Sequence, residues 1–193
     1  MIVDYGEKSI GLKIVFFGPA MSGKTTSVRW LFTTMGCPDR LTSIENSLGR
    51  TMFCDYGTIP IPISGGWTVN AHIWTATGQD FYRATRNVVM TGTDGVIFVA
   101  DAQRHLIDDN IASWRELLGM MEDSDRIIPI VVLLNKYDIS DPLPEPVFRE
   151  AIGAPPSIPI FTSVAPKGVN ILEAFQLLFQ NAIRASLLSQ SLL

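Results

Sequence analysis

Short apolar runs that alternate with helical stretches constrain the fold of this 193-residue chain more than any other feature. Four of these runs are each long enough for one buried strand: "LKIVFFG" (12–18), "GVIFVAD" (95–101), "IPIVVLL" (128–134) and "SIPIFTS" (157–163). Helical sequence is predicted at residues 23–35, 79–90, 106–121, 145–152 and 169–188. This alternation predicts an α/β fold with a doubly wound, mostly parallel sheet.

Two further strands are predicted on either side of Gly65 and Gly66. The segments "TMFCDYGTIPIPI" (51–63) and "WTVNAHIWT" (67–75) flank this glycine pair, which is typical of a β-hairpin. Because Pro60 and Pro62 cannot donate to a sheet ladder, the first arm is predicted as an antiparallel edge strand. The whole prediction is a six-stranded sheet with one antiparallel edge strand.

The rest of the chain shows no feature that divides it. The segment 36–49 is polar and lacks periodicity, so it is predicted as a long loop. There is no internal repeat, no low-complexity segment and no linker. We therefore expect a single domain over residues 1–193.

Composition excludes several classes of protein. A net charge of −4 argues against a general nucleic-acid binder, which usually carries a basic stripe. The apolar runs fall short of the roughly 20 residues that span a bilayer. Asp4 and Glu7 lie where a signal peptide would have basic residues, so no signal peptide is predicted. We therefore expect a cytoplasmic protein. The tail has no cysteine and residue 2 is Ile, so no lipid anchor is expected.

The segment "GPAMSGKT" (18–25) matches the phosphate-loop pattern G-x-x-x-x-G-K-[ST]. It lies between a predicted strand and a predicted helix, where backbone N–H groups and the helix N-terminus can surround phosphates. Lys24 adds positive charge, and the Thr25 hydroxyl can bind Mg²⁺. The alternative is a glycine-containing turn with no ligand. The predicted phosphate-binding residues are Gly18, Ala20, Met21, Ser22, Gly23, Lys24, Thr25 and Thr26.

The segment "NKYD" (135–138) follows a buried strand and indicates which base is bound. The carboxylate of Asp138 could accept two hydrogen bonds from N1–H and the amino group of guanine, a pair that adenine cannot offer. The stem of Lys136 could cover the face of the base. The alternative is an ordinary polar turn after a strand. The remaining residues predicted around the base are Asn135, Ser163, Val164 and Ala165, the last three from "TSVAPKG" (162–168).

With these motifs the chain resembles a Ras-superfamily small GTPase and, more narrowly, the MglA-type polarity GTPases of prokaryotes. The resemblance covers nearly the whole chain. It rests on "KIVFFGPAMSGKTT", "GRTMFCDY", "TATGQDFYRATRNVVMTGTDGVIFVADAQ", "NKYD" and "VAPKGVN". It implies the P-loop small GTPase fold, binding of GTP and GDP with Mg²⁺, slow hydrolysis of GTP, and switch segments near 36–62 and 74–90.

The resemblance also implies catalytic roles. Gln79, after Gly78, matches the glutamine that orients the attacking water, and Lys24 serves the outer phosphates. Arg50 matches an arginine that the family supplies from the same chain as a transition-state finger, a device that contributes about 10³–10⁵ in rate. Thr51 matches the threonine that senses Mg²⁺ and the γ-phosphate.

Two positions depart from the pattern of most related switches. Ala20 stands where glycine is usual, and its methyl group narrows the space in which a partner's arginine finger would enter. Thr75 stands where an aspartate usually helps to hold Mg²⁺, a replacement common in MglA-type proteins. Asp55 could supply the missing charge, so the predicted metal ligands are Thr25, Thr51 and Asp55. Along a straight strand Thr51 and Asp55 would lie about 13 Å apart, too far to share one ion.

Partners and competing functions follow from the same resemblance. It implies an activator dimer of the Roadblock type, similar to MglB, and an effector of unknown kind. A pseudo-GTPase that holds nucleotide without turnover is favoured by Thr75 and Ala20 and opposed by Arg50 and Gln79. A metabolic P-loop kinase is disfavoured by "NKYD" and by the lack of an evident lid.

Overall fold

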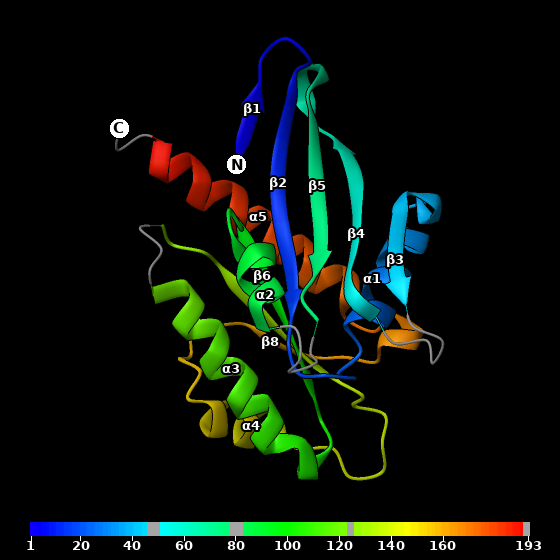
Figure 1. Ribbon diagram of the computed structural model, residues 1–193, viewed down its shortest axis with the longest axis vertical. Coiled ribbons are helices and arrows are strands. Elements are labelled where there is room, and N and C mark those ends of the chain that lie inside the picture. The colour runs from blue at the N-terminus through cyan, green and yellow to red at the C-terminus, as the bar shows by residue number, and fades with distance from the viewer. Residues whose placement is uncertain (46–50, 78–82, 123–125, 191–193) are drawn as a thin grey trace.

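The structure, a computed structural model, describes residues 1–45, 51–77, 83–122 and 126–190. Its centre is one eight-stranded sheet with the order β3-β4-β5-β2-β6-β7-β8, and β1 pairs with β2 outside this path (Figure 1). The strands are β1 (Ile2–Asp4), β2 (Ser9–Phe17), β3 (Leu41–Glu45), β4 (Thr51–Pro62), β5 (Thr68–Thr75), β6 (Gly95–Asp101), β7 (Ile130–Asn135) and β8 (Ile160–Thr162). The helices are α1 (Lys24–Thr34), α2 (Arg83–Met90), α3 (Ile107–Glu122), α4 (Glu145–Ile152) and α5 (Ile171–Gln190).

The pairing of the strands confirms the predicted α/β class. Strands β5, β2, β6, β7 and β8 are parallel, whereas the pairs β1–β2, β3–β4 and β4–β5 are antiparallel. The sheet has two strands more than the six predicted. One of them, β3, lies inside the segment predicted as a loop, so that prediction was wrong for 41–45. This segment is polar, and its strand geometry comes from pairing with β4 and not from a periodicity of its own.

The hairpin at Gly65 and Gly66 is present, and both glycines have the positive φ of a tight turn, 74° and 73°. The prediction that its first arm lies at an edge holds only in part. Strand β3 covers β4 from Thr51 to Gly57, whereas Pro60 and Pro62 are paired with β5 alone. The prolines therefore lie where, among the described residues, no strand pairs with the outer side of β4, so their lack of an N–H group leaves no ladder bond unmade.

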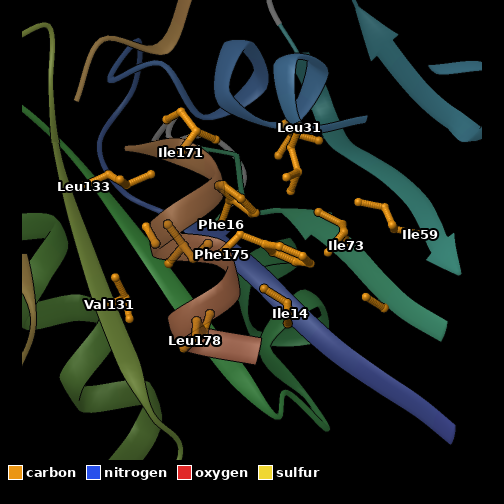
Figure 2. Packing of buried hydrophobic residues seen from close by; sticks show 14 of the residues in the cluster. Ile14, Phe16, Leu31, Ile59, Ile73, Val131, Leu133, Ile171, Phe175 and Leu178 are labelled. Atoms are coloured by element: carbon orange, nitrogen blue, oxygen red, sulfur yellow. The ribbon is translucent and has the colours of Figure 1, made fainter. Parts of the chain in front are cut away.

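Alternate residues of β2 enter two different hydrophobic cores. Ile14 and Phe16 pack with α1 and α5, where Leu31, Phe175 and Leu178 surround them (Figure 2). Val15 and Phe17 belong to the core on the other face, with Trp114 of α3 and Phe148 of α4. The sheet is therefore buried on both faces, as its long apolar runs predict.

The loops that carry the predicted motifs lie together at the carboxyl ends of the parallel strands. Because β2, β6, β7 and β8 are parallel, their carboxyl ends lie together, and open α/β sheets bind ligands at this edge. The phosphate loop follows β2, "NKYD" begins at the end of β7, and residues 163–165 follow β8. None of the helices in the described part of the chain is long and apolar enough to cross a membrane.

Candidate functional site: phosphate loop, metal ligands and base pocket

The phosphate loop is tightly packed against its neighbours at two glycines. A Cβ atom on Gly18 would lie 2.1 Å from the carbonyl oxygen of Val99, and one on Gly23 would lie 2.1 Å from the Nδ2 atom of Asn135. Both glycines also have positive φ, 145° and 103°. No other residue fits these positions, so the loop has the shape that brings backbone N–H groups toward an anion.

Lys24, the first residue of α1, is folded back onto this loop. Its Nζ atom donates hydrogen bonds to the carbonyl oxygens of Gly18 at 2.9 Å and Pro19 at 2.7 Å. Burial, and to a smaller extent the positive charge of Arg86, lower the pKa of Lys24 to about 7, and Asp55 opposes this shift. A buried ammonium group that is held mainly by carbonyl oxygens would be stabilised in its charged form by a phosphate.

We therefore expect nucleotide binding at pH 8 to take up close to one proton. In the free protein Lys24, with a pKa of about 7, is mostly neutral at this pH, whereas beside a phosphate it regains its charge. Affinity should fall as the pH rises above 7, by up to about tenfold per unit. Titration calorimetry of nucleotide-free protein with GDP, in buffers of different ionisation enthalpy, measures the uptake.

Lys24→Arg is the matched variant for this measurement. Arginine keeps the positive charge at every accessible pH, so the variant should bind GDP without proton uptake. Equal uptake in both proteins would mean that another group takes the proton.

Asp55 lies directly beside the metal-binding end of the phosphate loop. Its Oδ2 atom accepts hydrogen bonds from the hydroxyls of Thr25 at 2.7 Å and Thr75 at 2.9 Å. Its Oδ1 atom accepts one from Ser43 at 2.5 Å, and its backbone N–H donates to the Thr75 hydroxyl at 2.7 Å. Asp55 is fully buried. Hydroxyls from three segments, α1, β3 and β5, therefore converge on one carboxylate of β4.

This oxygen-rich cluster fits Mg²⁺. Magnesium in nucleotide enzymes is held by one or two carboxylates together with substrate phosphates, and it keeps several of its waters. Among the described residues there is no group of three or more His, Cys, Asp or Glu side chains that could form a closed metal site. One carboxylate, Asp55, beside the Thr25 hydroxyl is the donor set that a shared protein–phosphate metal site needs.

Two of the three predicted metal ligands, Thr25 and Asp55, are thus in direct contact. The third, Thr51, is the first residue of β4, and four extended residues separate it from Asp55 by about 13 Å. The side chain of Thr51 lies outside the described part of the structure. Ser43 was missed by sequence reasoning because it falls in the segment predicted as a loop, where only the β3–β4 register places it opposite Asp55.

The predicted base pocket is held together by Asn135. Its Nδ2 atom donates to the carbonyl oxygen of Ser22 at 2.7 Å, and its Oδ1 atom accepts from the backbone N–H of Ala165 at 2.9 Å and from the Ser163 hydroxyl at 3.3 Å. Asn135 is only 2% exposed. This one amide therefore joins the phosphate loop, "NKYD" and the loop after β8.

The two charged residues of "NKYD" form ion pairs with different partners. Lys136 has a φ of 62°, and its Nζ atom lies 2.6 Å from Oδ2 of Asp101. Asp138 is partly exposed, and its Oδ2 atom lies 3.1 Å from Nζ of Lys167. An exposed pair of this kind contributes little free energy, so the carboxylate of Asp138 is accessible to the donors of a base.

Three of the predicted residues, Arg50, Gly78 and Gln79, lie outside the described residues. The described chain ends beside them at Thr77, whose carbonyl oxygen accepts a hydrogen bond from Nε of Arg86 at 2.8 Å. Arg86 also forms an ion pair with Glu116 of α3. This buried arginine, which sequence reasoning missed, links Thr77, which follows β5, to Glu116 of α3.

Comparison with known proteins identifies the arrangement. The family described as "Ras of Complex, Roc, domain of DAPkinase" matches residues 13–138, from β2 to the last residue of "NKYD". The protein MglA of Myxococcus xanthus, described as a mutual gliding-motility protein, is 31% identical over 179 residues, which cover 90% of this chain and 91% of MglA. The chain belongs to the Ras superfamily of small GTPases.

Other relatives of this small GTPase include Rab proteins. Rab7 of Pisum sativum is 26% identical over 180 residues, covering 90% of this chain and 83% of Rab7. The human Ras-related protein Rab-7b is 24% identical over 178 residues, covering 91% and 84%. The predicted resemblance to MglA-type small GTPases is confirmed, and membership of the family implies a guanine-nucleotide site with Mg²⁺ and GTP hydrolysis.

Proposed function

We propose that this small GTPase is a molecular switch that binds GTP and GDP with Mg²⁺ and hydrolyses GTP slowly to GDP and phosphate. The observation that supports it best is the buried carboxylate of Asp55 beside the hydroxyls of Thr25 and Thr75. Thr75 is one of the two residues that favour an inactive nucleotide holder, because a threonine adds no charge. Asp55 restores a negative charge at that place from the neighbouring strand.

Each of the predicted site residues has a separate role in hydrolysis. Backbone N–H groups of residues 20–25 and Lys24 bind the phosphates, and Thr25 and Asp55 would hold Mg²⁺, which would supply positive charge beside them. Gln79 orients a water that attacks the γ-phosphorus as the bond to the bridging oxygen breaks. Arg50 stabilises the charge that develops, so GTP and water give GDP and phosphate.

The same contacts connect the γ-phosphate to the switch segments. Asp55 lies on β4 and Thr75 ends β5, so the segments 36–62 and 74–90 meet at Asp55, which also accepts a hydrogen bond from Thr25. A change in the ligands of the ion would shift the balance between two arrangements of these segments.

The second candidate function is a pseudo-GTPase that holds guanine nucleotide without turnover. Ala20 favours it, because its methyl group adds bulk at an exposed position of the phosphate loop. Single-turnover incubation of the full chain with γ-labelled GTP separates the two. Release of labelled phosphate faster than from a Lys24→Ala variant supports hydrolysis, and GTP that stays bound and intact supports the pseudo-GTPase.

Arg50→Ala is expected to slow single-turnover hydrolysis by at least about tenfold and to leave GTP affinity nearly unchanged. The physical reason is that an arginine finger contacts charge that develops only in the transition state. The matched control is Arg184→Ala, which removes an exposed arginine from α5. Equal rates in the two variants, with and without an activator, would contradict the assignment of Arg50.

Similarity to MglA also supports an activator of the Roadblock type, and the effector is left open. Because Ala20 narrows the phosphate loop, the activator would act by positioning Arg50 and Gln79 of this chain. In that case an activator should fail to accelerate the Arg50→Ala variant.

A further inference from the structure

A buried carboxylate that the mechanism does not use lies beside the base pocket. Asp101 is the last residue of β6 and is 1% exposed. Its Oδ2 atom lies 2.6 Å from Nζ of Lys136. The register of the sheet pairs Asp101 with Asn135, so the ends of β6 and β7 place this carboxylate next to "NKYD".

The carboxylate of Asp101 is itself held in place. The backbone N–H of Gln103 donates to its Oδ1 atom at 3.0 Å, and Nε2 of Gln103 lies 3.2 Å from both carboxylate oxygens. The fully buried Asn110 of α3 accepts from the backbone N–H of Asp101 at 2.9 Å and donates to its carbonyl oxygen at 2.8 Å. A carboxylate fixed in this way can orient a flexible partner.

The partner, Lys136, has an unusual backbone and a long side chain. Its φ of 62° lies in the left-handed region, which few residues other than glycine adopt. Its side chain is one-third exposed, and without an anchor it would sample many rotamers. The ion pair with Asp101 fixes both ends of the aliphatic stem, one at the backbone and one at the ammonium group.

We propose that Asp101 is a positioning residue for guanine-nucleotide binding. It holds the stem of Lys136 as a preformed surface against which the base packs, so that binding does not have to order this side chain. Asp101 acts through Lys136 and does not itself contact the nucleotide. The inference rests on the proposed function, namely that this site binds guanine nucleotides.

The test measures the release of a fluorescent GDP analogue from the full chain with Mg²⁺ by stopped flow. Asp101→Asn is expected to accelerate release about tenfold, because it removes a charged hydrogen bond that orders the pocket. The matched control is Asp141→Asn, which removes an exposed ion pair with Arg104 and should release GDP at the wild-type rate. Single-turnover hydrolysis of bound GTP should be unchanged in both, since the phosphates are not touched.

A second variant distinguishes positioning from general damage to the fold. Lys136→Met keeps an apolar stem and removes the ammonium group, so Asp101→Asn should change GDP release by less than about twofold in that background. Wild-type release from Asp101→Asn, or an undiminished acceleration in the Lys136→Met background, would overturn the proposal. If the proposed function itself were wrong, the wild-type chain would not bind GDP, which is a different result from either of these.

Discussion

Asp138→Asn is expected to weaken GTP binding by at least about 100-fold and to strengthen binding of xanthosine triphosphate. The carboxylate accepts two hydrogen bonds from guanine, and a site built for such bonds discriminates by about 10⁴ or more against a ligand that leaves them unmade. An asparagine offers one acceptor and one donor, so its NH₂ group would face the amino group of guanine. Xanthine carries a carbonyl oxygen at that place and can accept from the amide.

Competition binding with GTP, xanthosine triphosphate and ATP measures this change in specificity. Asp141→Asn, three residues further along the same turn, is the matched control because Asp141 is 72% exposed and contacts only Arg104 among the interactions that the structure shows for its side chain. It should leave all three affinities unchanged. If Asp138→Asn kept wild-type affinity for GTP, the base would be recognised elsewhere, and "NKYD" would be a polar turn.

The hydrophobic pattern of the sequence predicted the strands and helices whose own side chains form the core. The runs at β2, β6 and β7 are apolar because both faces of these strands are buried, and α4 begins and ends at the predicted residues, Glu145 and Ile152. Strand β3 has no such signal. Its five residues form a strand because they pair with β4, and the sequence of the segment alone does not reveal this pairing.

The position of Asp55 beside Thr25 could not be predicted either, because it depends on the register between strands. The pairing of Tyr56 with Trp74 fixes the register of β4 on β5 and places Asp55 opposite Thr75. A hairpin loop shorter or longer by one residue would turn Asp55 to the other face of the sheet. Sequence could nominate Asp55 as a substitute carboxylate, but only the register brings it to Thr25. The buried Asp101 was missed for the same reason, since only the pairing of β6 with β7 brings it next to Lys136.

Asp55→Asn is expected to accelerate the loss of GTP in the presence of Mg²⁺ by at least about tenfold, the lower end of what altered metal surroundings usually cost. The reason is charge: three hydroxyls, from Thr25, Ser43 and Thr75, converge on this carboxylate, and no hydroxyl can replace its negative charge at the ion. Thr75→Ala should have a smaller effect, because it removes one neutral oxygen. Filter binding of labelled GTP over time, with and without Mg²⁺, measures the difference between the variants.

The comparison also tests whether Asp55 serves the ion in one nucleotide state only. Thr51 and Asp55 lie on the same strand, about 13 Å apart where β4 is extended, so they cannot both reach one ion unless β4 bends or slides. Faster loss of GTP but not of GDP from Asp55→Asn would mean that Asp55 serves the ion in the GTP state. Faster loss of GDP alone would contradict the expected loss of GTP and would mean that Thr51 takes the place of Asp55 when the γ-phosphate is present. Ser43→Ala is the control, because it removes a donor to Asp55 and leaves Thr25 and Thr75 in place. A defect confined to Thr75→Ala would contradict both versions and leave the threonine hydroxyl as the replacement for the usual aspartate.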